Sequence, residues 1–168
     1  MLQSHLWEKI QINGLTFEQY LQRTIEDSEK TIPMDASEII KSRHSILKLN
    51  IHRMKRVEKT YFPSDELNHE IKSIKEKQIW LVISEPWCGD SAQVVPQLAK
   101  MAEVNPLIEL KILLRDENPD IMDLYVSKDN KRSIPVLVVL DEAEEELFKW
   151  GSRPVEAEKL ISQLKANG

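Results

Sequence analysis

The chain's single cysteine, Cys88, is the residue best suited to chemistry. It follows an apolar run at residues 80–83 and a short turn, and it precedes a segment with helical spacing. This order places the thiol where a buried strand passes into a helix N-terminus, whose unpaired N–H groups and positive dipole end favour thiolate over thiol. The sequence therefore predicts a reactive thiol rather than a small buried side chain.

The side chains around this thiol suggest how a partner reaches it. Trp87 offers a flat apolar surface, and Gly89 permits close approach of another backbone. Asp90 has two interpretations: its carboxylate stabilises the first helical turn, or it opposes thiolate formation and serves as a proton relay or ligand contact. We expect the structural role for Asp90. Ser91 completes the motif Cys88-Gly89-Asp90-Ser91.

A second motif lies far downstream, where Ser133, Ile134 and Pro135 precede the apolar run at residues 136–140. A proline that opens a buried strand has no N–H for the ladder and is a candidate for a cis peptide bond. We therefore expect the bond between Ile134 and Pro135 to be cis.

These motifs together resemble the thioredoxin family over residues 63–168: Trp-Cys-Gly at 87–89, Pro96 five residues beyond Ser91, and Ile134-Pro135 before a core strand. A closer resemblance, over nearly the whole chain, is to a bacterial branch of thioredoxin family proteins. The segments that carry it are residues 49–56, 85–90, 115–118, 133–135 and 150–154. The resemblance implies a thioredoxin fold, in which a mixed central sheet is flanked by helices and Ile134 and Pro135 border a groove beside Cys88.

Two residues depart from the pattern of this family. Ser91 stands where a thioredoxin carries its second cysteine, and a serine cannot resolve a mixed disulfide. Val82 stands where many thioredoxins have a buried aspartate that accepts a proton. Both departures argue against an ordinary dithiol reductase.

Three functions fit this pattern. In the first, Cys88 forms a mixed disulfide with a protein or small thiol, which an external thiol then resolves. In the second, the protein is a non-catalytic binding module that uses the groove around Trp87 and Pro135. The third is glutathione or iron–sulfur handling, because Cys-Gly-Asp-Ser has the form found in monothiol glutaredoxins, but the segment after Pro135 lacks their Gly-Gly turn. We expect the first.

Several arginines are candidates for an electrostatic role near the thiol. Arg53 and Arg56 belong to a basic stretch at residues 48–59, which is either a solvated helix face or a positive wall that attracts an acidic partner. Arg115 and Asp116, at a strand end, suggest either an ion pair or a turn anchor. Arg153, next to Pro154, is a weaker candidate to face the same groove.

The remaining pattern predicts a helical extension at residues 1–61, packed on a thioredoxin-like domain at residues 62–168. Thr16 with Gln19 forms a capping box, and Asp35 with Glu38 begins a long helix to about Tyr61. An apolar stripe recurs every seven residues along that helix, at Ile40, Leu47, Met54 and Tyr61. After residue 78 the order β-α-β-α-β-β-α suggests two parallel crossovers and a final hairpin, followed by a helix from Pro154 that buries Ala157, Leu160, Ile161 and Leu164.

Composition limits the functional classes. The net charge of −5 gives no reason to expect nucleic acid, and no apolar run is long enough to span a membrane. One cysteine excludes an internal disulfide, which suits a reducing, cytoplasmic location. None of the four histidines has the spacing of a metal site, so we expect no metal and no cofactor. The oligomeric state stays open.

Overall fold

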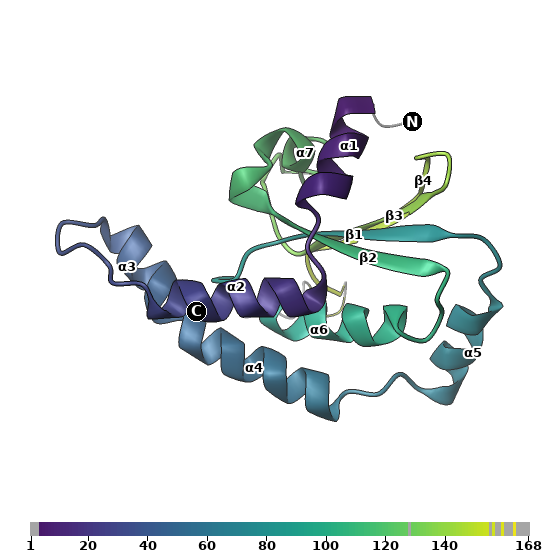
Figure 1. The fold of residues 1–168 in the computed structure, drawn as a ribbon, viewed down its shortest axis with the longest axis horizontal. Helices are drawn as coiled ribbons and strands as arrows, with labels where there is room; N and C mark the ends of the chain where they lie inside the picture. Colours follow the sequence, from purple (N-terminus) through teal and green to yellow (C-terminus); the bar gives the residue numbers. More distant parts are fainter. Residues whose placement is uncertain (1–3, 128, 155, 157–158, 160–162, 164–168) are drawn as a thin grey trace.

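A single four-stranded mixed sheet organises the molecule (Figure 1). The computed structural model describes residues 4–127, 129–154, 156, 159 and 163. The strands are β1 (Gln78–Ser84), β2 (Ile108–Leu114), β3 (Val136–Asp141) and β4 (Glu146–Gly151), in the order β2-β1-β3-β4. β1 pairs in parallel with β2 and antiparallel with β3, and β4 pairs antiparallel with β3. The expected thioredoxin fold, with a mixed sheet flanked by helices, is confirmed.

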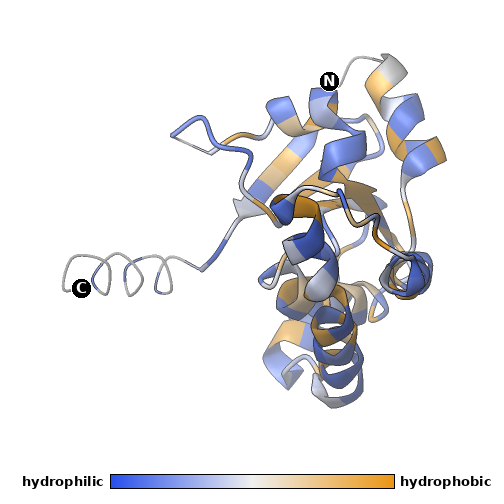
Figure 2. Cartoon of the chain, turned by 90° about the vertical axis from the view of Figure 1, so that its left-hand side faces the viewer, coloured by the Kyte–Doolittle hydropathy of each residue, from blue (hydrophilic) through white to orange (hydrophobic). Residues whose placement is uncertain are grey.

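Helices cover both faces of this sheet. On one face lie α2 (Phe17–Glu29), α4 (Leu47–Thr60) and α6 (Ser91–Ala102), with α5 (Asp65–Ser73) at one end, and on the other lie α1 (Ser4–Asn13) and α7 (Pro119–Asp123). Figure 2 shows that these helices carry both hydrophilic and hydrophobic residues, as amphipathic helices packed on a sheet do.

Strand β1 is buried on both faces, as its continuous apolar sequence predicts. Trp80 and Val82 join the core cluster under α2, α4 and α6, while Leu81 and Ile83 join the cluster under α1 and α7. This alternation follows from the two-residue period of a strand. The cysteine motif thus begins at the end of one of the two central strands.

The expectation of two parallel crossovers is wrong, because β3 runs antiparallel to β1. The helix between β2 and β3 has only five residues and is about 8 Å long, whereas the seven-residue strand β2 is about 23 Å long. So short a helix cannot return the chain along the sheet, and β3 starts at the edge where β2 ends. The β1–α6–β2 unit is the one parallel crossover among the described strands.

The N-terminal segment differs in part from its sequence pattern. The capping box of Thr16 and Gln19 is confirmed at the start of α2. The long helix expected to Tyr61 is instead two helices, α3 (Glu38–Ser45) and α4, which meet at Ile46, and Ser37 rather than Asp35 caps the first. None of the residues of α3 is buried, so the predicted apolar stripe does not contact the core at Ile40.

Helices α2 and α4 contribute Phe17, Tyr20 and Met54 to the same core cluster as β1. Leu15, in the turn after α1, exchanges backbone hydrogen bonds with Ile112 at the outer edge of β2. The division of the chain after residue 61 stays a prediction.

The helix predicted from Pro154 has its four expected apolar residues outside the described part of the chain. Within the described part, none of the helices combines the length and the apolar character that crossing a lipid bilayer requires.

Candidate active site

The sheet topology brings the two sequence motifs together. Ile83 near the end of β1 pairs with Val136 at the start of β3, so the residues after β1 and before β3 share one edge of the sheet. The Sγ of Cys88 accordingly lies 3.7 Å from the carbonyl oxygen of Ile134. The bond between Ile134 and Pro135 is cis, as predicted.

Cys88 lies just before α6 and is partly exposed. The backbone N–H of Ser91, the first residue of α6, donates to Sγ at 3.5 Å, and the thiol faces the Ile134 carbonyl. The sulfur therefore has one hydrogen-bond donor and one hydrogen-bond acceptor as its neighbours.

Ser91 and Val82, the two departures from the thioredoxin pattern, are both completely buried. The Oγ of Ser91 has no hydrogen-bond partner within the part of the chain that the structure describes. A buried hydroxyl without a partner costs about 1–3 kcal/mol, so Ser91 contributes no obvious stabilising contact through its oxygen. Val82 belongs to the same core cluster as Val95 and Leu114, and its side chain has no atom that accepts a proton.

Asp90 pairs with Arg153. The Nε and Nη2 of Arg153 lie 2.7 and 2.6 Å from the Oδ2 of Asp90. Asp90 stands directly before α6 and makes no side-chain capping bond. Its expected effect on the first helical turn, through the charge of its carboxylate, stays a prediction. The guanidinium of Arg153 offsets this negative charge two residues after Cys88.

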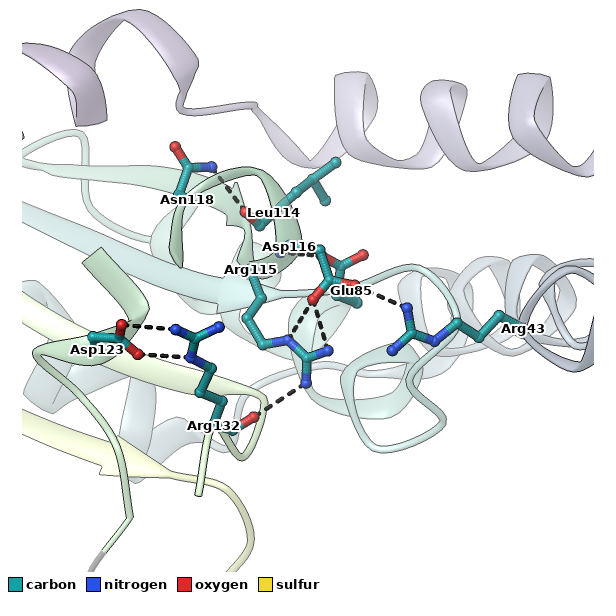
Figure 3. A network of polar contacts seen from close by, with 8 residues as sticks. All are labelled: Arg43, Glu85, Leu114, Arg115, Asp116, Asn118, Asp123 and Arg132. Carbon is teal, nitrogen blue, oxygen red and sulfur yellow. Dashed lines mark hydrogen bonds and ion pairs between the residues drawn. The ribbon is translucent and has the colours of Figure 1, made fainter. Parts of the chain in front are cut away.

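Two guanidinium groups lie against the ring of Trp87. The guanidinium of Arg43, from α3, lies 4.0 Å from the centre of the Trp87 ring, and that of Arg115 lies 4.9 Å from it. Both arginines also bind the carboxylate of Asp116, at 3.0 and 2.7 Å (Figure 3). The predicted ion pair of Arg115 and Asp116 is therefore present, and it forms part of a clamp over Trp87.

This clamp extends to the loop that carries Pro135. Arg115 donates through Nη1 to the backbone carbonyl of Arg132 at 3.1 Å, and the Arg132 side chain in turn pairs with Asp123 of α7 (Figure 3). Arg115 therefore joins the end of β2 to the loop two residues before Ile134.

Glu85 is a buried carboxyl group three residues before Cys88. Its Oε1 accepts the backbone N–H of Asp116 at 2.7 Å, and its backbone carbonyl accepts the N–H of Cys88 at 3.0 Å. Burial raises the pKa of Glu85 to about 7, and the Asp116 N–H partly offsets this effect. Glu85 thus ties the cysteine turn to the end of β2.

Helix α4 supports the same turn from the other side. The Nδ2 of the fully buried Asn50 donates to the carbonyl of Pro86 at 2.8 Å, and Arg53 donates to the Oδ1 of Asn50 at 3.1 Å. The Nη1 of Arg53 also lies against Gly89, at 3.3 Å from where a β-carbon would be. One turn on, Arg56 donates to the Oε1 of Gln93 in α6 at 3.1 Å.

The structure thus brings predicted arginines onto the chain neighbours of Cys88: Arg115 onto Trp87, Arg53 against Gly89 and Arg153 onto Asp90. It places Arg56 one helical turn beyond Arg53. Sequence reasoning missed Arg43, Glu85 and Asn50. The available signal for Glu85 was an ionisable residue two positions after the apolar run at residues 79–83, since a carboxyl group so close to a buried strand is itself prone to burial. Asn50 and Arg43 gave no comparable signal, because polar residues are ordinary on helices.

The sequence model of a family described as Thioredoxin matches residues 33–165, which is most of the chain. The chain belongs to the thioredoxin family. Among curated proteins, none matches it.

Two solved structures share this fold. A Pseudomonas aeruginosa protein of unknown function is 18% identical, with a TM-score of 0.62 over 96% of this chain and 85% of that one. An HIV epitope-scaffold protein is 21% identical, with a TM-score of 0.59 over 88% of this chain and 78% of that one. At these identities the likeness concerns the fold alone, so the chemistry of this thioredoxin family member is argued from its own residues.

Proposed function

We propose that this protein carries out monothiol disulfide exchange through Cys88. The observation that carries the proposal is the setting of the Cys88 sulfur. It is partly exposed, it accepts the N–H of Ser91 at the start of α6, and it lies against the loop of Ile134 and Pro135. A thiolate is the nucleophile in disulfide exchange, and donors at a helix N-terminus stabilise it.

The exchange takes place in two balanced steps. The Cys88 thiolate attacks one sulfur of a disulfide RS–SR, an S–S bond forms between Cys88 and that sulfur, and RS⁻ leaves and takes up a proton. An external thiol then attacks the mixed disulfide, releases Cys88 as a thiol and forms a new disulfide with R. The external thiol is required because Ser91 replaces a resolving cysteine.

The alternative of a non-catalytic binding module receives less support from the geometry. That interpretation uses the flat face of Trp87 as a platform for a partner. The guanidinium of Arg43 lies over this ring at 4.0 Å and is itself held by Asp116 at 3.0 Å. A partner would have to displace a charged side chain from both contacts, so we favour exchange at Cys88.

The test is the rate at which Cys88 forms a mixed disulfide. Purified protein is mixed with hydroxyethyl disulfide, a neutral reagent, and the adduct is followed by intact-mass spectrometry. We expect an adduct on the wild type, its loss in Cys88→Ser, and its release by an added thiol.

A displaced thiol provides the matched control, because any exposed cysteine reacts to some extent. In the double variant Cys88→Ser/Gln97→Cys the thiol stands on α6, away from its N-terminus and at a partly exposed position. We expect it to react at least about tenfold more slowly than Cys88. Equal rates at the two positions would show that the surroundings of Cys88 do not enhance its reactivity, and the proposed function would then be refuted.

A further inference from the structure

Helix α4 carries an excess of positive charge next to the cysteine motif. Its 14 residues include five lysines and arginines and one acidic residue, in a protein whose net charge is −5. Arg53 and Arg56 of this helix are three residues apart and so lie on one face. Their contacts with Gly89 and Gln93 show that this face is turned toward the start of α6.

These two arginines differ from the others in the described part of the chain. Arg23, Arg43, Arg115, Arg132 and Arg153 each form an ion pair with a carboxylate. Arg53 and Arg56, in contrast, bond only to the neutral side-chain oxygens of Asn50 and Gln93 among the described residues. Among the described residues these two guanidinium groups therefore form no ion pair, and they lie against Gly89 and Gln93, on either side of the start of α6.

The carboxylate nearest to Cys88 in sequence does not compensate them, because Asp90 is already paired with Arg153 at 2.6 Å. An anionic group that approached Cys88 along α4 would therefore meet the two guanidinium groups. The carboxylate of Asp90 would repel it little, because Arg153 already offsets that charge. Guanidinium groups bind carboxylates through paired, charge-assisted hydrogen bonds, so the chemistry complementary to this surface is a carboxylate.

We propose that Arg53 and Arg56 bind carboxylate groups of the disulfide that exchanges with Cys88, and that the substrate class is a peptide-sized disulfide bearing carboxylates. This inference rests on the proposed function and names its substrate. Arg53 lies against Gly89, one residue from the reacting cysteine, and Arg56 extends the positive surface by one helical turn. The first carboxylate therefore binds close to the exchanging sulfur and the second further along α6.

The experiment compares three disulfides of different charge: oxidised glutathione, which carries carboxylates, neutral hydroxyethyl disulfide, and cationic cystamine. Rates of adduct formation at Cys88 are measured by mass spectrometry for the wild type and for Arg53→Gln/Arg56→Gln. We expect the ratio of the rate with oxidised glutathione to the rate with hydroxyethyl disulfide to fall about tenfold in the double variant, whatever change both rates share.

The matched control removes the same charge from the same helix. Lys55 and Lys59 are exposed residues of α4, and Lys55→Gln/Lys59→Gln should leave the preference among the three disulfides within about twofold of the wild type. If the lysine variant loses the preference for oxidised glutathione as fully as the arginine variant, only the overall charge matters and the specific site is refuted.

Salt dependence tests the wild type without any substitution, which matters because Arg53 supports the buried Asn50. Raising the ionic strength from about 20 mM to about 300 mM should slow the reaction with oxidised glutathione and leave that with hydroxyethyl disulfide nearly unchanged. If the wild type showed neither a preference for the carboxylate-bearing disulfide nor a salt effect, this inference would be overturned while the proposed function would stand. Failure of Cys88 to react with any of the three disulfides would instead overturn the proposed function.

Discussion

Arg153 and Asp90 form an ion pair of 2.6 Å that connects the segment after β4 to the residue two positions beyond Cys88. The pair brings a guanidinium to a carboxylate that would otherwise stand uncompensated next to the thiol. Because like charges disfavour each other, an unpaired Asp90 would oppose the thiolate of Cys88.

Replacing Arg153 by Gln should therefore slow the alkylation of Cys88. We expect a decrease of about threefold in the rate with iodoacetamide at neutral pH, since partly exposed pairs contribute less than about 1 kcal/mol. Asp90→Asn in the same chain should restore the rate. Lys9→Gln, which breaks the pair with Asp120 on α7, serves as the control and should have no effect. An unchanged rate in Arg153→Gln would show that the pair does not act on the thiol.

Glu85 should make the stability of the fold depend on pH. Its pKa is about 7 in the folded protein, against a usual value of 4.5, because burial disfavours the charged carboxylate. Between these two values the folded state binds more protons than the unfolded state, so the contribution of Glu85 to stability is complete below about pH 4.5 and is lost as the pH rises to about 7. The loss amounts to about 3 kcal/mol.

Urea unfolding of the wild type and Glu85→Gln at pH 5 and pH 8 measures this effect. The difference in free energy of unfolding between the two proteins should shift in favour of Glu85→Gln at the higher pH. Glu117→Gln, at an exposed position nearby, is the control and should follow the wild type. A difference that is the same at both pH values would contradict the raised pKa.

Ser91→Cys should give the protein a reversible internal disulfide with Cys88. Ser91 occupies the position of a resolving cysteine, three residues after Cys88, and its buried hydroxyl has no partner among the described residues. The wild type should not catalyse reduction of insulin by thioredoxin reductase, whereas Ser91→Cys should gain some activity. Val82, which supplies no proton acceptor, should keep that activity low. Substantial turnover by the wild type would show that a resolving thiol is not needed.

Met54→Ala should destabilise the whole molecule, because Met54 of α4 is fully buried in the same cluster as β1 and α6. We expect a loss of about 2–5 kcal/mol in a single urea transition. Leu49→Ala on the same helix, where the side chain is 48% exposed, should cost less than about 1 kcal/mol. Two separate transitions would indicate that residues 1–61 fold apart from the domain at residues 62–168. Equal costs of the two substitutions would contradict the burial of Met54 in the shared core.

The sequence by itself determined the features that depend on local chemistry. Cys88 follows a buried strand and precedes a helix, Ser91 excludes a second thiol, and Thr16 with Gln19 marks the start of α2. These features could be predicted because each rests on residues close together in the chain. The thioredoxin fold itself was predictable from Trp87-Cys88-Gly89 and Ile134-Pro135, which match a known family.

Only the tertiary structure decided which distant side chains meet at the site. Glu85 binds the backbone of Asp116 because the parallel pairing of β1 with β2 brings the ends of both strands to one edge of the sheet. Arg43 lies over Trp87 because α3 packs beside the same edge, and Arg153 pairs with Asp90 because β4 returns to that edge along β3. The helix break at Ile46 and the antiparallel direction of β3 likewise depend on how these segments pack against the rest of the fold. A charged residue can pair with many partners in a sequence, and only the fold selects one.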